Sequence, residues 1–276
     1  MKYIKHFSNL SGQTEYLNSA DIDTYLGYVD ENDTVYYDDA LPERYDNKYF
    51  TIESLGDGNT IYLKASNSTA AKTVSASTDN GETWVEYVSS VDDNGTALGT
   101  LNTGDKLLIK GENSTYAITT SNYNQFTSTG QFEVKGNIMS LIYGDNFENQ
   151  TELTGAYSFC SLFRNPNVVS AENLILPATT LSEHCYQYMF QNCSNLTAAP
   201  ELPATTLASR CYGNMFYGCT NLNSITCLAI DISASNCTYG WVSGVASTGT
   251  FVKNAAMTSW TTGNNGIPSG WTVVDA

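Results

Sequence analysis

The sequence predicts a mixed α/β, mainly β fold that begins with a helix-hairpin module. An immunoglobulin-like β-sandwich, a short leucine-rich solenoid and a C-terminal β cap follow. Three observations predict this order: aromatic runs near the start, short alternating runs with glycine-rich turns in the middle, and a segment that occurs twice at a spacing of 26 residues. The predicted boundaries are residues 1–45, 46–135, 136–253 and 254–276.

Charge and composition exclude several classes of partner. Twenty-eight acidic and twelve basic residues give a net charge of −16, and no stretch gathers Lys or Arg. Nucleic acid and anionic membranes are therefore not expected partners. The first residues carry Lys2 and Lys5 but no apolar run after them, and no later stretch approaches the ~20 apolar residues that span a bilayer. We expect neither a signal peptide nor a transmembrane helix.

The N-terminal module is predicted from two stretches. "SGQTEYLNSAD" has a helix start signal at Ser11, with Glu15 in the first turns. "TYLGYVDENDTVYYDD" places two strand-forming runs on either side of a polar turn. The turn itself could alternatively offer oxygen ligands for Ca²⁺ from Asp30, Asn32 and Asp33, although a plain turn is the favoured interpretation and no metal is expected.

The middle of the chain alternates like a β-sandwich. Runs such as "YFTIESL", "NTIYLKAS", "TWVEYVSS" and "DKLLIKG" lie between residues 49 and 134. The turn signals Gly56-Asp57-Gly58, Asp79-Asn80-Gly81 and Asp93-Asn94-Gly95 separate them. Strands at this spacing are typical of an immunoglobulin-like sandwich.

The doubled segment predicts repeats that stack. "LPATTLSEHCYQYMFQNCSNL" begins at Leu176 and "LPATTLASRCYGNMFYGCTNL" at Leu202. A period of this length with leucines indicates a leucine-rich solenoid, and the i, i+4, i+8 spacing of its apolar residues indicates a helix over residues 182–192. The predicted repeat core is Cys185, Met189, Phe190, Cys193, Leu196, Cys211, Met215, Phe216, Cys219 and Leu222.

The cysteine columns are predicted to be core thiols. Neighbouring helices lie ~8–10 Å apart, which is beyond the ~4.4–6.8 Å between Cα atoms that a disulfide requires. The chain has seven cysteines, no C-x-x-C pair, and a lone His184 that is expected to point outward. We therefore expect no zinc site, no other metal and no cofactor.

Four tyrosines are the candidate ligand-binding residues of the repeats. Tyr186 and Tyr212 form a column off the expected buried stripe, and Tyr188 and Tyr217 lie near it. Exposed aromatic rings can stack on the C–H faces of sugars. The alternative is that these tyrosines pack between neighbouring helices or chains.

One motif points toward an enzyme, but no catalytic residue is predicted. "SASTDNGETWVEY" carries Ser77, Asp79, Gly81, Thr83 and Trp84 at a spacing that resembles the Asp-box of sialidases. Asp-boxes in those families are structural, and Asp79-Asn80-Gly81 makes a turn whether or not chemistry is nearby. A sialidase also needs several boxes and an arginine cluster, whereas the arginines here are scattered.

The motif "CYGNMFYGCTNLNSI" resembles the BspA-like leucine-rich repeats, whose units carry a phenylalanine, a nearby cysteine and then a leucine. The resemblance covers about residues 136–256 and departs from the family in its longer unit and in Pro166. The order of the modules, with the ending "TTGNNGIPSGWTVVDA", is also similar to structural proteins of phages that infect gut Bacteroidales. These resemblances imply a virion protein that is assembled in the host cytoplasm.

The expected function is a non-enzymatic virion appendage, a tail or head fibre or decoration, whose repeats attach to the host. The N-terminal module would bind other virion proteins, the repeats would face a host-surface glycan or protein, and the chain would form a homo-oligomer. A purely structural virion component and a bacterial cell-surface adhesin are the alternatives, and a glycosidase ranks last.

Overall fold

The computed structural model describes residues 2–5, 16–17, 25–29, 35–37 and 49–276. The chain forms two compact units, Met1–Arg44 and Tyr45–Ala276. In the first unit, the described residues form an antiparallel sheet in the order β2-β1-β3-β4. Its strands are β1 (Lys2–Lys5), β2 (Tyr16–Leu17), β3 (Tyr25–Val29) and β4 (Val35–Tyr37).

The predicted helix-hairpin module is therefore wrong. Tyr16 and Leu17 pair with β1 as a strand, so cross-strand pairing outweighs the weak helix start signal at Ser11. Strands β3 and β4 are antiparallel neighbours, with Tyr28 opposite Tyr36. The rest of the expected helix, and the Ca²⁺ alternative at residues 30–33, lie outside the described residues.

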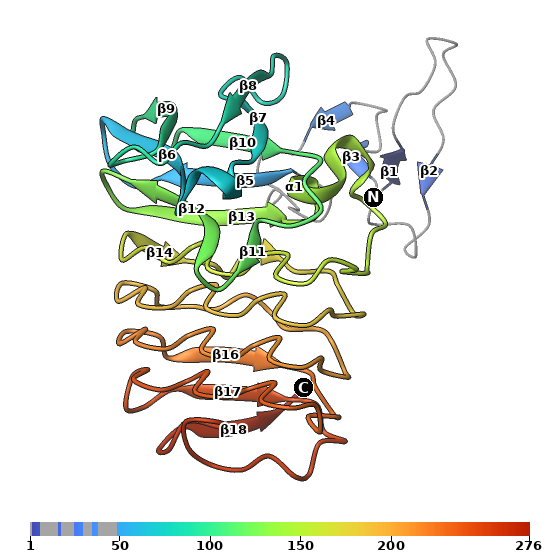
Figure 1. The fold of residues 1–276 in the computed structure, drawn as a ribbon. Coiled ribbons are helices and arrows are strands. Elements are labelled where there is room, and N and C mark those ends of the chain that lie inside the picture. The colour runs from blue at the N-terminus through green and yellow to red at the C-terminus, as the bar shows by residue number, and fades with distance from the viewer. Residues whose placement is uncertain (1, 6–15, 18–24, 30–34, 38–48) are drawn as a thin grey trace. The chain divides into compact units, whose positions relative to one another are not determined.

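The second unit begins with two sheets packed face to face (Figure 1). One has the order β14-β13-β5-β10-β7-β8, with β15 also paired to β13, and the other has the order β11-β12-β6-β9. The bounds are β5 (Phe50–Ser54), β6 (Asn59–Ala65), β7 (Thr73–Ser77), β8 (Val85–Val88), β9 (Thr96–Leu101), β10 (Lys106–Lys110), β11 (Ala117–Thr119), β12 (Asn122–Ser128), β13 (Phe132–Asn137), β14 (Val168–Ser170) and β15 (Leu174–Ile175). The short helices η2 (Ser68–Ala70), α1 (Ser140–Tyr143) and η3 (Gly144–Asn146) complete this part.

Alternating apolar side chains form the core between these sheets. The pattern of β6 alternates strictly between buried and half-buried residues, as a strand with one face on a core requires. Phe50 of β5 and Phe126 of β12 meet across the two layers, with ring centroids 5.3 Å apart. Because β5 and β6 lie in different sheets, the strand arrangement is not that of an immunoglobulin domain, in which the first two strands share a sheet.

The sandwich continues into the repeats without a break in packing. Strand β13 pairs antiparallel with β5 on one side and parallel with β14 and β15 on the other. The ring of Phe163, which follows the sandwich, stacks on Phe126 and lies tilted against Phe50. The predicted boundary between residues 135 and 136 falls inside β13, so the two parts share one core.

Residues 150–276, here called the coil stack, run as successive coils that lie one below another in Figure 1. Alternate backbone N–H groups donate to the carbonyls of the next coil: Tyr186 to Cys211 at 3.0 Å, and Tyr212 to Cys237 at 2.9 Å. The stack ends in a parallel sheet of β16 (Ser224–Cys227), β17 (Thr250–Lys253) and β18 (Thr272–Asp275). Equivalent residues of adjacent coils therefore face one another.

Within a coil, the chain is a ribbon of consecutive tight turns. The N–H groups that do not reach the next coil close turns on the carbonyl three residues back, as from Met189 to Tyr186. Every fourth residue has a positive φ: +58° at His184, +58° at Tyr188 and +61° at Asn192. Two inward residues thus alternate with two outward residues along the ribbon.

The predicted fold class is wrong for this part of the chain as well. Residues 182–192 form turns where a helix was expected, and α1 is the one α-helix of the described residues. The apolar spacing of four residues suits an α-helix, but it suits this ribbon equally, since both return to the same face after about four residues. The units are turn-built coils and not the strand-plus-helix units of a leucine-rich solenoid.

Aromatic rings run through the centre of the coil stack in two ladders. One leads from Phe163 through Phe190 to Phe216, with centroids 5.3 and 5.8 Å apart. The other leads from Phe159 through Tyr186 to Tyr212, and both ladders converge on the buried Trp241. In the described part of the chain, no helix has the length and apolar character needed to cross a membrane.

Candidate functional site

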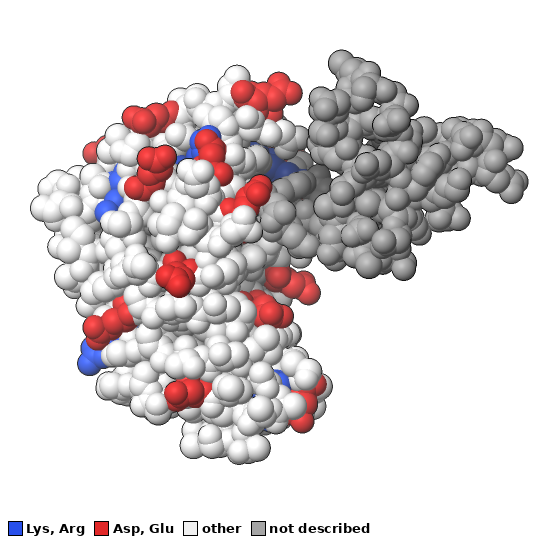
Figure 2. Space-filling model, turned by 90° about the vertical axis from the view of Figure 1, so that its right-hand side faces the viewer, with Lys and Arg blue, Asp and Glu red and all other residues white. Residues whose placement is uncertain are grey.

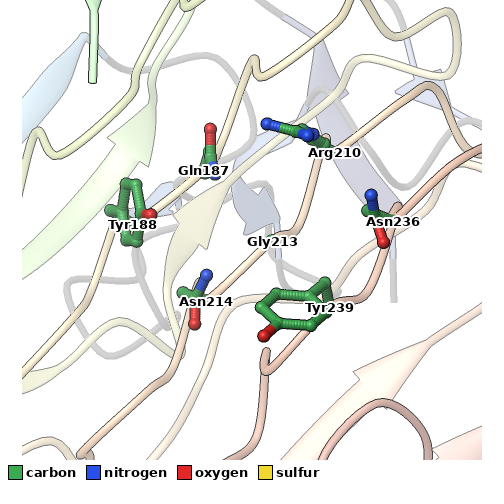
Figure 3. Close-up of a pocket in the computed structure, with 7 residues that line it drawn as sticks. All are labelled: Gln187, Tyr188, Arg210, Gly213, Asn214, Asn236 and Tyr239. Atoms are coloured by element: carbon green, nitrogen blue, oxygen red, sulfur yellow. The ribbon is translucent and has the colours of Figure 1, made fainter.

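The outer face of the coil stack carries a hollow of about 220 Å³. Three successive coils contribute the residues that line it. These residues are Gln187, Tyr188, Arg210, Gly213, Asn214, Asn236 and Tyr239. In Figure 3, the six side chains surround Gly213, with Arg210 and Gln187 on one side and Asn214 and Tyr239 on the other. Below, these seven residues are called the Gly213 hollow.

The turn ribbon places these side chains on the outer face. Arg210, Asn214 and Asn236 each have a positive φ, of +52°, +51° and +53°, at the turn positions that face outward. Asparagine adopts this conformation more readily than most residues, whereas Arg210 does so because the neighbouring coils fix its backbone. The N–H of Arg210 donates to the Ser235 carbonyl at 3.0 Å, which holds it in line with the coil below.

Gly213 leaves the space at the centre. It occupies the same outward position in its coil as Gln187 and Tyr239 do in theirs, but it has no side chain. A Cβ atom there would lie 3.4 Å from the Gln187 Nε2 and 3.4 Å from the Arg210 carbonyl. Because its φ is not positive, the backbone at residue 213 does not itself demand glycine.

The protein uses some of the polar groups of the hollow itself: the Asn236 amide donates to the Ser235 hydroxyl at 3.5 Å. Gln187 is 5% exposed, and its Oε1 accepts a hydrogen bond from the Nδ1 of His184, whose ring stacks on Tyr157 at 4.3 Å. Arg210 is exposed and forms no ion pair with any described residue. The carboxylate of Glu183, in the preceding coil, accepts a hydrogen bond from the Ser209 hydroxyl at 3.1 Å.

Charged side chains cover little of the face that Figure 2 shows. Figure 2 shows acidic side chains spread singly over the sandwich and the coil stack, with most of that face uncharged. Three lysines of the second unit are paired: Lys110 with Asp145 at 2.7 Å, Lys135 with Glu53 at 3.0 Å, and Lys253 with Asp275. Arg210 differs from these three lysines in having no ion pair with a described residue.

The structure separates the four predicted ligand-binding tyrosines. Tyr188 lines the Gly213 hollow, and Tyr217 is 43% exposed but does not line it. Tyr186 and Tyr212 are each only 1% exposed, so neither ring is open to a ligand in this structure, in line with the alternative that they pack between neighbouring units. In a helix they would lie about 100° from the buried cysteine beside each of them, whereas in the turn ribbon two consecutive residues both face inward. Burial also raises the pKa of Tyr186 well above its usual range.

The ten residues predicted as the repeat core are all fully buried. Cys193 and Cys219 donate through their thiols to the carbonyls of Phe163 and Phe190 in the preceding coil, at 2.8 and 3.0 Å. These contacts fix the corner at which each ribbon turns into the next segment. All seven cysteines of the chain are free.

Equivalent cysteines of adjacent coils lie closer together than the sequence predicted. Helices would have held them ~8–10 Å apart, whereas adjacent coils are joined by parallel backbone hydrogen bonds and therefore lie at the ~4.8 Å spacing of neighbouring strands. Burial raises the pKa of the Cys160 thiol to about 11 and that of the Cys227 thiol to about 12. The thiols of Cys160 and Cys227 are therefore protonated at neutral pH.

The Asp-box residues close the turn between β7 and β8. Asp79 accepts hydrogen bonds from the Ser77 hydroxyl at 2.6 Å and from the Thr83 N–H at 2.9 Å. Hydrogen bonds from Ser77 and then Thr83 lower the pKa of Asp79 to about 2. Trp84 packs edge-on against Tyr49 and carries the Lys110 ammonium 4.2 Å above its ring. Each of these groups has a structural partner.

Most residues of the Gly213 hollow were not predicted from the sequence. Arg210, Gly213, Asn214, Asn236 and Tyr239 were not predicted as site residues, because the helix interpretation gave no reason to compare the outward residues of three coils. A signal was present: Gly213 interrupts a column that otherwise carries Gln187 and Tyr239. Among the described residues, no three His, Cys, Asp or Glu side chains gather as metal ligands would.

The chain was compared with family models, curated proteins and solved structures. No family model, curated protein or solved structure matches the chain.

Proposed function

We propose that this chain is a non-enzymatic appendage of a bacteriophage particle, and that the outer face of its coil stack attaches the particle to the host surface. The observation that carries the proposal is the Gly213 hollow. There, two tyrosine rings, three amides and an unpaired guanidinium meet around a space left by one glycine. Such groups bind by stacking and hydrogen bonding.

The rigidity of the coil stack supports a role in recognition. Each coil that lines the hollow is tied to the next by backbone hydrogen bonds, such as Tyr188 to Gly213 at 3.0 Å and Asn214 to Tyr239 at 2.8 Å. The two aromatic ladders fill the interior behind it. A site held in this way loses little conformational freedom when a ligand binds, which favours affinity.

The origin of the protein in a virus particle is supported by resemblance and by its thiols. The residues Phe190, Cys193 and Leu196 resemble the motif of BspA-like repeats, and the order of the modules is similar to structural proteins of phages. Seven free, buried cysteines suit a chain that folds in a reducing cytoplasm. In this proposal, the first unit binds other particle proteins.

Two measurements on the same phage test the proposal. Mass spectrometry and immunogold labelling of purified particles should detect the protein at a fixed position on the particle. The purified protein, added in excess, should slow adsorption of the phage to its host. Absence from particles would overturn the proposal, and presence on particles without any effect on adsorption would leave a purely structural component instead.

A further inference from the structure

We infer that the Gly213 hollow binds a sugar acid, a pyranose ring that carries a carboxylate, with the carboxylate held by Arg210 and the ring placed against Tyr239. This inference rests on the proposed function and names the ligand class of the same site. The size of the hollow, its charge and its polar lining all fit such a ligand.

The size of the hollow suits one ring. Its volume of about 220 Å³ is below the roughly 300–1,000 Å³ of pockets that enclose drug-sized ligands. The space exists because Gly213 has no side chain, while the equivalent residues of the coils on either side are a glutamine and a tyrosine. A single ring can enter the hollow while the rest of a saccharide chain lies along the outer face of the stack.

The charge of the hollow selects an acid. The Arg210 guanidinium is exposed at its rim and has no ion pair with a described residue. Glu183, the acidic residue of the preceding coil, is already in contact with the Ser209 hydroxyl at 3.1 Å and lies 3.4 Å from the His184 Nε2. A guanidinium presents paired N–H donors in a plane, which match the two oxygens of a carboxylate.

The remaining lining suits the rest of a sugar. Tyr239 is 58% exposed and offers a ring face to the C–H groups of a pyranose. The side chains of Asn214 and Asn236 flank the space on the two sides of that ring. Amides both donate and accept hydrogen bonds, as ring hydroxyls also do.

Calorimetry on the full chain, with two matched ligands, tests the inference. The probes are a trisaccharide of galacturonic acid and its neutral counterpart of galactose. We expect the acidic trisaccharide to bind about tenfold to a hundredfold more tightly than the neutral one, which is the usual gain from a hydrogen-bonded charged pair. The difference should shrink as salt is added.

Two variants distinguish the effect of Arg210 from the effect of the protein's overall charge. Arg210→Gln should remove the preference for the acidic trisaccharide, whereas Arg164→Gln, which removes an equal charge outside the hollow, should leave it unchanged. Equal binding of the two trisaccharides, or an equal loss in both variants, would overturn the inference. A protein that slows phage adsorption but binds neither trisaccharide would overturn the inference alone, while one that does neither would overturn the proposed function as well.

Discussion

Replacing glycine by alanine at residue 218 should destabilise the protein, whereas the same replacement at residue 213 should not. This difference in stability tests the turn ribbon. Gly218 has a φ of +75°, and a Cβ atom there would lie 2.5 Å from the Asn192 Oδ1. Asn192 is exposed and can rotate away, so the lasting cost of Gly218→Ala is the left-handed backbone, about 1–2 kcal/mol for a residue with a Cβ. In a unit of this size, that loss lowers the melting temperature by roughly 2–8 °C.

Gly213→Ala is the matched control. Its φ is not positive, and its added methyl group meets no atom closer than 3.4 Å. Replacing glycine where the backbone allows it gains about 0.4–1 kcal/mol from the unfolded state, so this variant should be as stable as the wild type or slightly more stable. Urea unfolding followed by circular dichroism measures both variants. Equal stabilities of the two variants would refute the ribbon of left-handed turns.

Three further predictions concern the core and the Asp79 turn. Phe190→Ala should lower the free energy of unfolding in urea by about 3–5 kcal/mol, because the Phe190 ring contacts both neighbouring rings of a ladder. Tyr217→Ala, at an exposed ring, should lower it by less than about 0.5 kcal/mol. Similar losses in the two variants would contradict the ladder. A thiol reagent that becomes coloured on reaction should label the seven buried cysteines slowly in the native protein and fully in urea. Burial shields these thiols and raises their pKa values where a shift is resolved, as at Cys160 and Cys227. Rapid labelling of the native protein would contradict that burial. The pKa of Asp79 in the folded protein, about 2, lies below its ordinary 3.8, so the ionised carboxylate stabilises the fold above pH ~4 and this contribution is lost as the pH falls through 2. Asp79→Ala should therefore have a lower melting temperature than the wild type at pH 7. A difference in melting temperature that does not narrow in acid would exclude this mechanism.

The sandwich strands were largely predictable from their local patterns. The runs around β5, β6 and β10 form strands as expected, and β6 alternates strictly between buried and half-buried residues. The turn signals fall at residues with positive φ, such as Asn80 and Gly95. Strands β9 and β12 were missed, because "TALGTL" contains a glycine and "NYNQFTS" is polar along most of its length. Burial of Asn124 and Phe126 between the layers, which local propensity cannot register, makes β12 a strand.

The coil stack shows where periodicity is ambiguous. Cysteines and methionines four residues apart fit an α-helix and a ribbon of paired turns equally well over a segment of about ten residues. The distinguishing signal is Asn and Gly at the same spacing, at Asn214 and Gly218 and again at Asn236 and Gly240, because these residues accept a positive φ. This signal also decides the site, since it turns Tyr186 inward and leaves Tyr188 and Tyr239 outside.

Binding of the fluorescently labelled protein to host cells shows whether the Gly213 hollow is the attachment surface. The comparison is between the wild type and Gly213→Leu, which fills the hollow with a side chain at a position where the next coil carries the large, exposed Tyr239. We expect saturable binding of the wild type and loss of that binding in Gly213→Leu. The two proteins should have the same circular dichroism spectrum and melting temperatures within a few degrees of each other. Equal binding by two equally well-folded proteins would show that the Gly213 hollow does not attach the chain to its host.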